Sequence, residues 1–576
     1  MVANRGEIAI RVFRTLRELG IGSVAVYSDA DRLARHASYA DEAYALGGET
    51  AAESYLVVEK LVAAARRAGA EAVHPGYGFL AENAGFARAC EEAGLVWVGP
   101  PADAIELMGT KTVARETMRA AGVPIVPGTT DPVGSAADVV RLGEELGYPL
   151  IVKAVAGGGG KGMKLVHSAE EAERAFESAG REGQAFFANA DVYVERYLVD
   201  PRHVEVQVLA DGHGNVVHLG ERDCTIQRRH QKLIEETPSP AVDEKLRARI
   251  GRIAVDAARA AGYRSAGTIE GLLSAEGDYY FMEMNTRIQV EHTVTEAVTG
   301  IDLVREQLRI AAGEPLSWTQ EAIRFRGHAS ECRINAEDVA AGIMPAPGTI
   351  TVYREPSGPG VRVDSGVAAG SEISPLYDPM IAKLIVHDVD RESARRRMLR
   401  ALDEFELGGV KTLLGFHRAL LRHPCFVAGG TCHGFVESDE LAAAAGELER
   451  APVGEAAALN GRLRERVTQV EVDGRRFDVK VLEPEPPWVE LAARRAERRR
   501  TARGAADEEV VSPMQGTVIA VKVAVGDEVR AGQVVCVVEA MKMENEIVAH
   551  RDGVVSALGV ANGQPVRHGD LICVVG

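Results

Sequence analysis

Hydrophobic and polar positions follow two different patterns in the first part of this chain, short apolar runs and helical periodicity. Short apolar runs at residues 22–27, 72–76 and 95–100 alternate with segments of helical periodicity such as 56–68. Alternating strands and helices of this kind predict a parallel sheet covered by helices. The same patterns predict a helix at 111–121 and further strands at 149–153, 192–195, 203–210 and 279–283.

The pattern changes after about residue 440. Residues 326–440 still form a mixed block that is too regular for a linker. The segment that follows contains alanine-rich stretches, a proline-rich break at 483–487 and a basic run at 494–500, which predict irregular structure. Within it, residues 470–481 alternate around Asp473-Gly474, a typical β-hairpin signal. The basic run could be a nucleic-acid patch, but a solvated helix face or a linker is the preferred interpretation.

The last block, residues 508–576, contains an internal repeat. Gly516, Gly526 and Gly532 each have a counterpart 37 residues later, at 553, 563 and 569. Two similar β-rich halves predict a small sandwich with pseudo-two-fold symmetry and glycine turns. The turn between the halves, residues 539–545, should project from one end of the sandwich, and it contains Lys542.

Composition narrows the class of protein without assigning a function. The chain has 576 residues and a formal net charge of −18, which argues against a general binder of nucleic acid or anionic membranes. This length predicts about three to five domains. No apolar run approaches a membrane-spanning helix, and residues 1–7 contain no apolar signal-peptide region. The seven cysteines are scattered without a CxxC pair, so we expect reduced thiols and a cytoplasmic protein; Cys425 and Cys432 come nearest to a pair.

Two groups of residues carry candidate chemistry. A glycine run at 157–160, followed by Lys161, comes after an expected strand, and glycines let backbone N–H groups approach phosphate oxygens. This run is not a P-loop, because no Gly-Lys-Ser/Thr follows it. Alternation along the strand near 281–285 places Glu283 and Asn285 on one face. With Glu270 nearby in sequence, these side chains offer oxygen ligands of the kind that suit Mg²⁺.

The final block resembles the biotinyl domain of biotin-dependent carboxylases. The resemblance rests on Lys542, which lies between Met541 and Met543 at the midpoint of the duplicated β-domain. It implies an all-β flattened barrel or sandwich, biotin attached to Lys542, and a biotin protein ligase as a partner. The lipoyl domain shares this fold and is the alternative. Its lysine usually follows an acidic residue, so the flanking methionines count against it.

Nearly all of residues 1–440 resemble biotin carboxylase, an ATP-grasp enzyme in which two lobes hold ATP between them. The motifs are commonplace one by one but specific in this order, at residues 3–9, 74–80, 108–111, 195–198, 203–207, 221–224, 228–232, 281–292 and 331–337. The implied fold is an α/β N-terminal lobe, an ATP-grasp domain and an α+β C-terminal lobe. The implied domains are 1–108, 109–325 with a lid at about 126–197, 326–440, a linker with a possible small β docking element at 441–507, and the biotinyl domain at 508–576.

The resemblance also implies roles for individual residues. ATP binding is implied for Lys111, Lys153, Gly158, Gly159, Gly160, Glu195, Arg196, Leu198, His203, His230, Gln231 and Glu270. Binding of Mg²⁺ or Mn²⁺ is implied for Glu270, Glu283 and Asn285, and binding of biotin for Tyr77 and Arg333. Bicarbonate binding is implied for Lys232, Arg287, Gln289 and Val290, with Glu291 as the base, so that Lys232, Arg287, Glu291 and Arg333 are the expected catalytic residues. The nearby cations should favour the carboxylate form of Glu291.

The implied activity is that of a ligase. ATP would activate bicarbonate as carboxyphosphate, biotin would be carboxylated, and a separate carboxyltransferase β subunit would take the carboxyl group. The preferred interpretation is the α subunit of an acetyl- or propionyl-CoA carboxylase, with a homodimer of carboxylase domains inside a larger αβ complex and no nucleic acid or membrane. A subunit serving a pyruvate carboxylase-type carboxyltransferase is the alternative. A non-enzymatic carrier with a degenerate carboxylase half is a third possibility, against which the intact site residues argue.

Four positions depart from the pattern of that family. Met1 lies almost directly before the first motif, so either the first strand is truncated or the start of the sequence is misassigned. Gly271 stands where relatives usually carry an aromatic residue, which should loosen the local packing. Thr293 replaces a usual proline, which should relax the turn before it. Arg196 replaces a lysine, a change that should matter little if this position acts through its backbone.

Overall fold

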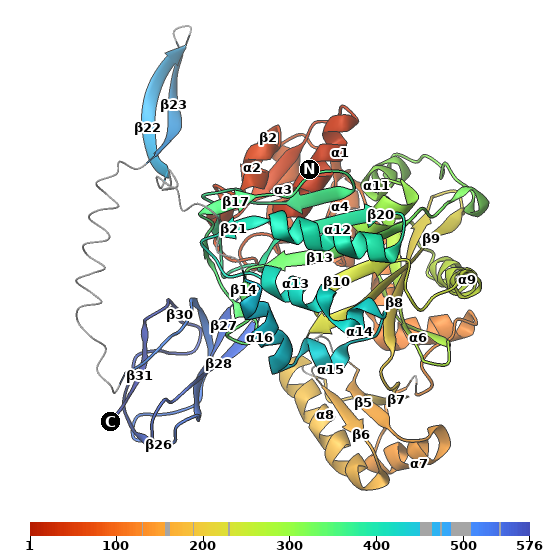
Figure 1. Cartoon of the computed structure of the whole chain (residues 1–576). Coiled ribbons are helices and arrows are strands. Elements are labelled where there is room, and N and C mark those ends of the chain that lie inside the picture. The colour runs from red at the N-terminus through yellow and green to blue at the C-terminus, as the bar shows by residue number, and fades with distance from the viewer. Residues whose placement is uncertain are drawn as a thin grey trace.

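A computed structural model describes residues 1–129, 131–155, 162–187, 189–228, 231–449, 463–472, 475–484, 509–540 and 543–576 (Figure 1). Within these ranges, no helix combines the length and the apolar composition that crossing a bilayer requires.

The first 109 residues alternate between helices and short parallel strands, as predicted. The helices are α1 (Gly6–Glu18), α2 (Arg35–Tyr39), α3 (Val58–Arg67), α4 (Ala84–Glu92) and α5 (Ala102–Gly109). Strand β1 (Val24–Tyr27) pairs in parallel with β2 (Glu42–Ala45), and β3 (Ala72–Val73) pairs in parallel with β4 (Val96–Trp97). Val2 joins the two pairs through parallel bridges to Ala25 and His74. The expected first strand is therefore reduced to one bridging residue.

A long antiparallel sheet runs through the middle of the molecule. Its strands, in spatial order, are β12 (Tyr279–Asn285), β11 (Ser265–Leu273), β8 (Arg202–Ala210), β9 (Val216–Arg228), β10 (Gln231–Thr237), β13 (His328–Asn335), β20 (Met380–Asp388) and β18 (Val361–Ser365). Its helical neighbours include α6 (Lys111–Ala120), α9 (Glu244–Ala260), α10 (His292–Thr299), α11 (Leu303–Ala311) and α12 (Arg391–Glu404). Along β8, Val204, Val206 and Val208 join the apolar core shared with α9, while Glu205 and Gln207 alternate to the opposite face. A buried sheet face is thus left for polar residues.

Shorter elements complete the C-terminal part of this body. The strands are β14 (Glu337–Asp338), β15 (Met344–Pro345), β16 (Gly348–Thr349), β17 (Val352–Arg354), β19 (Glu372–Ile373) and β21 (Glu406–Gly408). The helices are α13 (Leu414–Arg422), α14 (Pro424–Val427), α15 (His433–Val436) and α16 (Asp439–Glu447).

A second, smaller sheet holds the segment expected to be a lid. Strands β6 (Met163–Val166), β5 (Leu150–Ala154) and β7 (Val192–Arg196) lie in that order, and helices α7 (Ala136–Leu146) and α8 (Ala172–Phe187) pack beside them. Figure 1 shows this unit projecting from the rest of the body. The strands predicted at 149–153 and 192–195 are confirmed.

The C-terminal block consists of two four-stranded sheets, as the repeat predicted. In the first sheet, the strands in spatial order are β24 (Glu509–Val511), β31 (Leu571–Val575), β29 (Gly553–Leu558) and β26 (Glu528–Val529). In the second sheet, they are β28 (Met543–Val548), β27 (Val534–Ala540), β25 (Gly516–Val521) and β30 (Pro565–Val566). The first residues of β25, β26 and β27 recur as those of β29, β30 and β31 after the same 37 positions. Ala540 pairs with Met543, so Met541 and Lys542, which lie outside the described residues, connect β27 to β28.

The predicted hairpin after residue 440 is also present. Strand β22 (Leu463–Val472) pairs antiparallel with β23 (Arg475–Pro484) along the full length of both strands. The expected Asp473-Gly474 turn and the basic run at 494–500 lie outside the described residues.

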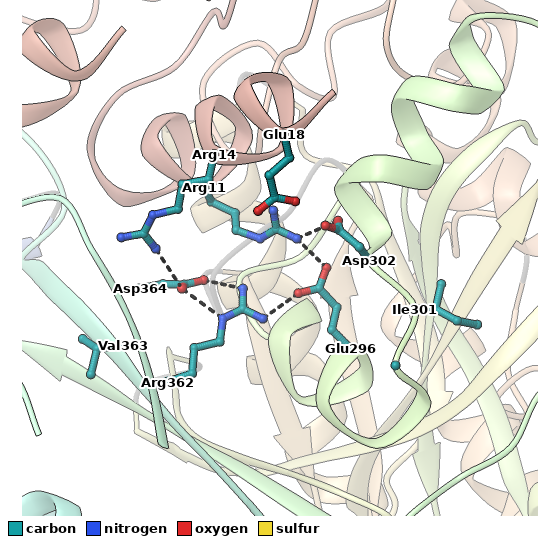
Figure 2. Close-up of a pocket in the computed structure, with 10 residues that line it drawn as sticks. Arg11, Arg14, Glu18, Glu296, Ile301, Asp302, Arg362, Val363 and Asp364 are labelled. Carbon is teal, nitrogen blue, oxygen red and sulfur yellow. Dashed lines mark hydrogen bonds and ion pairs between the residues drawn. The ribbon is translucent and has the colours of Figure 1, made fainter. Parts of the chain in front are cut away.

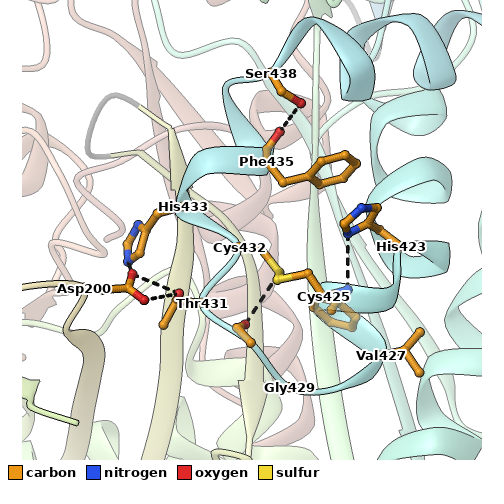
Figure 3. Close-up of a disulfide and its surroundings, with 12 residues drawn as sticks. Asp200, His423, Cys425, Val427, Gly429, Thr431, Cys432, His433, Phe435 and Ser438 are labelled. Atoms are coloured by element: carbon orange, nitrogen blue, oxygen red, sulfur yellow. Dashed lines mark hydrogen bonds and ion pairs between the residues drawn. A yellow bond between two sulfur atoms is a disulfide. The ribbon is translucent and has the colours of Figure 1, made fainter.

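The expectation that all cysteines are reduced is wrong for one pair. Cys425 and Cys432 form a disulfide with their Cα atoms 5.8 Å apart (Figure 3), a separation within the usual range for such bonds. Within this loop, Thr431 donates a hydrogen bond of 2.8 Å to Asp200, just before β8. The disulfide-closed loop therefore joins the C-terminal lobe to the start of the strand that carries Glu205. The other five cysteines, all within the described ranges, are buried free thiols.

Gly271 is packed tightly and does not leave the space expected from its missing side chain. A Cβ atom at this position would lie 2.3 Å from the ring of Tyr279 on the neighbouring strand. Tyr279 is buried, and its hydroxyl donates to the Ile269 carbonyl at 3.3 Å. The ladder between β11 and β12 skips Met282, and this bulge lies directly beside Gly271. The aromatic group comes from the partner strand, so the predicted loosening does not occur.

We expect Gly271→Ala to destabilise the carboxylase body by about 1–3 kcal/mol, because the added methyl group must displace the Tyr279 ring. Thermal unfolding of the full chain measures this effect. Gly446→Ala on α16 is the matched control, since nothing lies within 4 Å of its added Cβ, and it should leave stability unchanged or raise it by up to about 1 kcal/mol because alanine favours helix. Equal melting temperatures for the two variants would contradict the packing described for Gly271.

Candidate active site

The centre of the candidate site is the ammonium group of Lys232, on β10. It lies 2.6 Å from Glu205, 2.9 Å from Glu270 and 2.6 Å from Glu291. All three carboxylates are buried. Burial alone would lower the pKa of Lys232, but the three negative charges outweigh it and raise that pKa well above its usual value. Lys232 is therefore a permanent cation at the centre of an acidic cluster.

The strand register brings these carboxylates together. Glu205 and Glu270 are direct cross-strand partners on β8 and β11, so their side chains share one face of the sheet. Arg222, on β9, is fully buried and donates to Glu205 at 2.6 Å and to Gln207 at 2.7 Å. Neither Glu205 nor Arg222 is among the predicted site residues. Both lie inside motifs that carry the family resemblance, at 203–207 and 221–224, but only their contacts place them in the site.

Among the predicted residues that the structure describes, Glu270 accepts the most side-chain hydrogen bonds. Besides Lys232, it accepts from His203 at 2.7 Å, Asn285 at 2.7 Å and Gln289 at 2.6 Å. Burial alone would raise the pKa of Glu270, but Lys232 and His203 outweigh it and hold this pKa well below its usual value. The structure thus brings predicted nucleotide, metal and bicarbonate residues to one carboxylate.

Glu291 lies between two cations. It accepts from Lys232 at 2.6 Å and from Arg333, on β13, at 2.9 Å. Burial opposes ionisation, yet Lys232 and Arg333 lower the pKa of Glu291 well below its usual value, as predicted from the neighbouring charges. Arg333 also donates to Glu235 at 2.6 Å, and burial raises the pKa of that carboxyl to about 7. Glu291 is therefore ionised at neutral pH.

The oxygen donors expected to bind a metal meet at the edge of the sheet. Glu270 and Glu283 are direct cross-strand partners on β11 and β12. Burial and the facing Glu270 charge both raise the pKa of Glu283, a repulsion that a divalent cation would relieve. Carboxylate oxygens suit Mg²⁺, so Glu270 and Glu283 fit this ion, whereas the Asn285 side-chain oxygen accepts a hydrogen bond from Arg287. A tighter group of potential ligand atoms, within 4.8 Å of one another, comes from His203, Glu205 and Glu270 and leaves Glu283 outside.

Arg287 is fixed by the N-terminal lobe. Its side chain donates to Glu82 at 3.0 Å and to the Asn285 side-chain oxygen at 2.8 Å. Glu82 also accepts from the Thr286 backbone N–H at 3.0 Å. Glu82 was not predicted as a site residue. It connects the N-terminal lobe to the strand end that carries the expected bicarbonate ligands.

Three other expected nucleotide residues, Lys111, Lys153 and Glu195, lie on α6 and the lid sheet. Lys111 begins α6, and its charge acts on Glu283. Lys153 on β5 and Arg115 on α6 both form short hydrogen bonds to the buried carboxylate of Glu195. Arg196 and Gln231 are exposed and Leu198 is half-buried. Gly158, Gly159, Gly160 and His230, and the biotinylation candidate Lys542, lie outside the described residues.

Tyr77 projects from the N-terminal lobe and is half-buried. Its hydroxyl donates a short hydrogen bond to Glu7, in the first turn of α1. Burial raises the pKa of Tyr77 well above its usual value, and the charge of Arg333 opposes this shift. The two residues expected to contact biotin therefore lie close enough to influence each other.

Thr293 does not relax the turn before α10, contrary to expectation. It is buried in the first turn of that helix and donates a short hydrogen bond to Glu331, on β13. Burial raises the pKa of Glu331 well above its usual value. The hydroxyl thus connects α10 to the strand that carries Arg333.

A hollow of about 370 Å³ lies beside α1, α10 and β18, away from these residues (Figure 2). Arg11 contacts Glu296 at 2.8 Å, and Arg362 contacts both Glu296 and Asp364 at 2.7 Å. Its charged side chains are thus engaged with one another, and no predicted site residue lines it.

Comparison with protein families gives four matches along the chain. They are biotin carboxylase, N-terminal domain over residues 1–105; carbamoyl-phosphate synthase L chain, ATP binding domain over 110–319; biotin carboxylase C-terminal domain over 331–438; and biotin-requiring enzyme over 508–575.

Characterised relatives match closely. Biotin carboxylase 1 of Bacillus subtilis is 53% identical over 77% of this chain and 98% of its own length. The biotin-dependent acyl-coenzyme A carboxylase alpha3 subunit of Mycobacterium leprae is 46% identical over 95% of this chain and 93% of its own length. A pyruvate carboxylase subunit of Methanothermobacter thermautotrophicus is 54% identical over 76% of this chain and 89% of its own length.

Solved structures agree with these relatives. A biotin carboxylase–β,γ-ATP complex from Campylobacter jejuni has a TM-score of 0.72 and 44% identity, covering 75% of this chain and 97% of that one. The biotin carboxylase domain of Hydrogenobacter thermophilus 2-oxoglutarate carboxylase, in complex with MgADP, ADP and bicarbonate, has a TM-score of 0.72 and 48% identity, covering 76% and 98%. The chain therefore belongs to the biotin carboxylase family and joins a biotin carboxylase to a C-terminal biotin carrier domain.

Proposed function

We propose that this chain uses ATP and bicarbonate to carboxylate biotin carried on Lys542, and that a separate carboxyltransferase then transfers the carboxyl group to an acyl-CoA. The observation that carries the proposal is the position of Glu291, 2.6 Å from Lys232 and 2.9 Å from Arg333. A carboxylate base between two cations suits a reaction in which an anion must be bound, deprotonated and used as a nucleophile.

Bicarbonate would bind to Lys232, Arg287, Gln289 and the backbone of Val290, and Glu291 would accept its proton. The low pKa of Glu291 makes it a weak base in isolation. The cations that lower this pKa also stabilise the extra negative charge on deprotonated bicarbonate, so the proton transfer becomes less unfavourable.

A bicarbonate oxygen would then attack the γ-phosphorus of ATP, and ADP would leave. The resulting carboxyphosphate would split into CO₂ and phosphate, and this phosphate would remove the proton from the ureido nitrogen of biotin. Arg333 would stabilise the negative charge that develops on the ureido oxygen, while Tyr77 contacts the ring system. The deprotonated nitrogen would then attack the carbon of CO₂ to form carboxybiotin, and the proton would leave with phosphate.

ATP would be held by Lys111, Lys153, the glycines at 158–160, the segment Glu195–Leu198, His203, His230, Gln231 and Glu270. Glu270, Glu283 and Asn285 would hold Mg²⁺ or Mn²⁺. When bound, the metal neutralises charge on the phosphates during phosphoryl transfer.

The acyl-CoA assignment rests on coverage along the chain. The alignment with the acyl-CoA carboxylase alpha3 subunit covers 95% of this chain, which includes the carrier block, whereas the alignment with the pyruvate carboxylase subunit covers 76%. We propose a carboxyltransferase β subunit that acts on acetyl- or propionyl-CoA, a biotin protein ligase that modifies Lys542, and a cytoplasmic homodimer of carboxylase domains within the αβ complex. The β22–β23 hairpin, between the carboxylase and the carrier block, is the proposed docking element. The proposed domains end at residues 108, 325, 440 and 507, and the carrier block follows.

The purified chain should cleave ATP in a bicarbonate-dependent reaction that free biotin stimulates. Glu291→Gln removes the base but keeps the shape of the side chain, and we expect it to lower kcat by about 10²–10⁴-fold. Phosphate release measures this rate. Glu144→Gln, an exposed position on α7, is the control and should leave the rate unchanged. A Glu291→Gln variant with the wild-type kcat would rule out the assigned base.

Lys542→Arg should abolish streptavidin binding by the chain and leave carboxylation of free biotin intact, because only the attachment point is lost. Lys522→Arg, an exposed position in the same block, should retain streptavidin binding. Blotting with streptavidin and the free-biotin assay together check this prediction. Continued labelling of Lys542→Arg would place the biotin elsewhere.

Affinity purification of the tagged chain from its native cells should recover a carboxyltransferase β subunit. The complex should then fix labelled bicarbonate into acetyl- or propionyl-CoA and not into pyruvate. Labelled oxaloacetate from pyruvate, without acyl-CoA carboxylation, would instead support the pyruvate carboxylase-type alternative.

A further inference from the structure

Lys383 is a buried lysine that the proposed reaction does not use. It lies on β20, between β13 and β18, and its side chain is 0% exposed. A buried ammonium group is costly unless it is paired and hydrogen-bonded. Lys383 donates to the Val290 carbonyl at 2.8 Å and forms an ion pair with Glu7 at 3.2 Å.

The first of these contacts holds the turn that carries the expected bicarbonate ligands. In this turn, residues 289–291, the Val290 carbonyl accepts a hydrogen bond from Lys383, and the Gln289 carbonyl accepts one from the Nδ1 atom of His292 at 2.7 Å. A carbonyl oxygen can only accept, so Nδ1 must carry the proton. The side chains of the same turn bind the charged cluster: Gln289 donates to Glu270, and Glu291 accepts from Lys232. Both carbonyls are thus held by hydrogen bonds within the protein.

The second contact reaches the biotin side of the site. Glu7 accepts a short hydrogen bond from the Tyr77 hydroxyl, and the Lys383 ammonium lies 5.9 Å from the centre of the Tyr77 ring. The Tyr77 hydroxyl and the Lys383 ammonium therefore meet at one carboxylate. One buried cation is connected to the bicarbonate turn by a hydrogen bond and to the tyrosine through Glu7.

Against the effect of burial, the neighbouring acidic groups Glu331 and Asp364 attract the Lys383 ammonium and help to raise its pKa, but its hydrogen bond and its ion pair go to the Val290 carbonyl and Glu7. Asp364 is the cross-strand partner of Lys383, but its carboxylate is already engaged by Arg362 at 2.7 Å (Figure 2). Glu296, in the same network, is engaged by Arg11 at 2.8 Å and by Arg362 at 2.7 Å. The network is paired within itself, and the Lys383 ammonium points to the Val290 carbonyl and Glu7.

We propose that Lys383 is a positioning residue for the carboxylase reaction, one that aligns the 289–291 turn with Tyr77 so that bicarbonate and biotin meet in register. This inference rests on the proposed function. A displaced turn would hold bicarbonate less tightly and a displaced Tyr77 would hold biotin less tightly, so the loss of one buried hydrogen bond should raise the KM of both substrates.

The test compares Lys383→Met with wild type in the full chain, using bicarbonate-dependent ATP cleavage at saturating ATP. Methionine has a similar length but cannot donate to the Val290 carbonyl. We expect the KM for bicarbonate and the KM for free biotin each to rise about tenfold, while the KM for ATP stays within about twofold. Lys383→Arg keeps a donor and should recover part of the loss. The exposed Lys411→Met is the matched control and should match wild type.

A second variant keeps the test decisive if Lys383→Met does not fold. Tyr77→Phe removes only the hydroxyl that donates to Glu7, and we expect it to raise the biotin KM severalfold with an unchanged bicarbonate KM. Folded Lys383→Met with wild-type KM values would overturn the inference, even if its melting temperature falls. When Lys383→Met does not fold, a wild-type biotin KM for Tyr77→Phe would do the same. Absence of biotin-stimulated ATP cleavage in the wild-type chain would contradict the proposed function itself.

Discussion

The site depends on one electrostatic constraint, a single ammonium group held among three buried carboxylates. Lys232 contacts Glu205, Glu270 and Glu291 at 2.6–2.9 Å. Three buried negative charges with one cation between them would repel one another, so further cations must lie around the cluster. Arg222 contacts Glu205 and Arg333 contacts Glu291, while the His203 ring, which is a cation only when protonated, lies in hydrogen-bond contact with Glu270. The site is therefore pre-formed by its own charges.

This constraint explains why the site draws on several parts of the chain. Glu205 and Glu270 lie on adjacent strands of the long sheet, whereas Arg333 lies on β13, which follows β10 in the same sheet. The N-terminal lobe adds Glu82, which holds Arg287, and Glu7, which accepts from Tyr77. A pre-organised polar environment of this kind stabilises developing charge without rearranging during the reaction. Distant sequence segments are thus coupled through short hydrogen bonds.

Much of the fold could be predicted because its signals are local. Alternation predicted the strand at 192–195, which the structure has at Val192–Arg196, and the glycine repeat predicted the duplicated strands of the carrier block. The features that the sequence did not predict depend on contacts between distant segments. The contact of Glu205 with Lys232 depends on the registers of three strands, and the Cys425–Cys432 disulfide depends on how a loop closes.

Two further details also depend on contacts that the sequence does not show. Because Gly271 has no side chain, a space was predicted beside it. The Tyr279 ring of the facing strand fills this space, next to a bulge at Met282. Lys383 looks like an ordinary charged residue in an apolar strand, and only its partners reveal that it holds the Val290 carbonyl. Sequence patterns identify which residues carry chemistry more readily than which residues hold them in place.

The central claim is that this cluster activates bicarbonate by phosphorylation. The most direct measurement is isotope transfer, in which the chain, ATP and free biotin react with bicarbonate labelled with ¹⁸O. The account predicts that the released phosphate carries one labelled oxygen from bicarbonate, because the bridging oxygen of carboxyphosphate stays on phosphorus when CO₂ leaves. Biotin-dependent release of phosphate without label would contradict it.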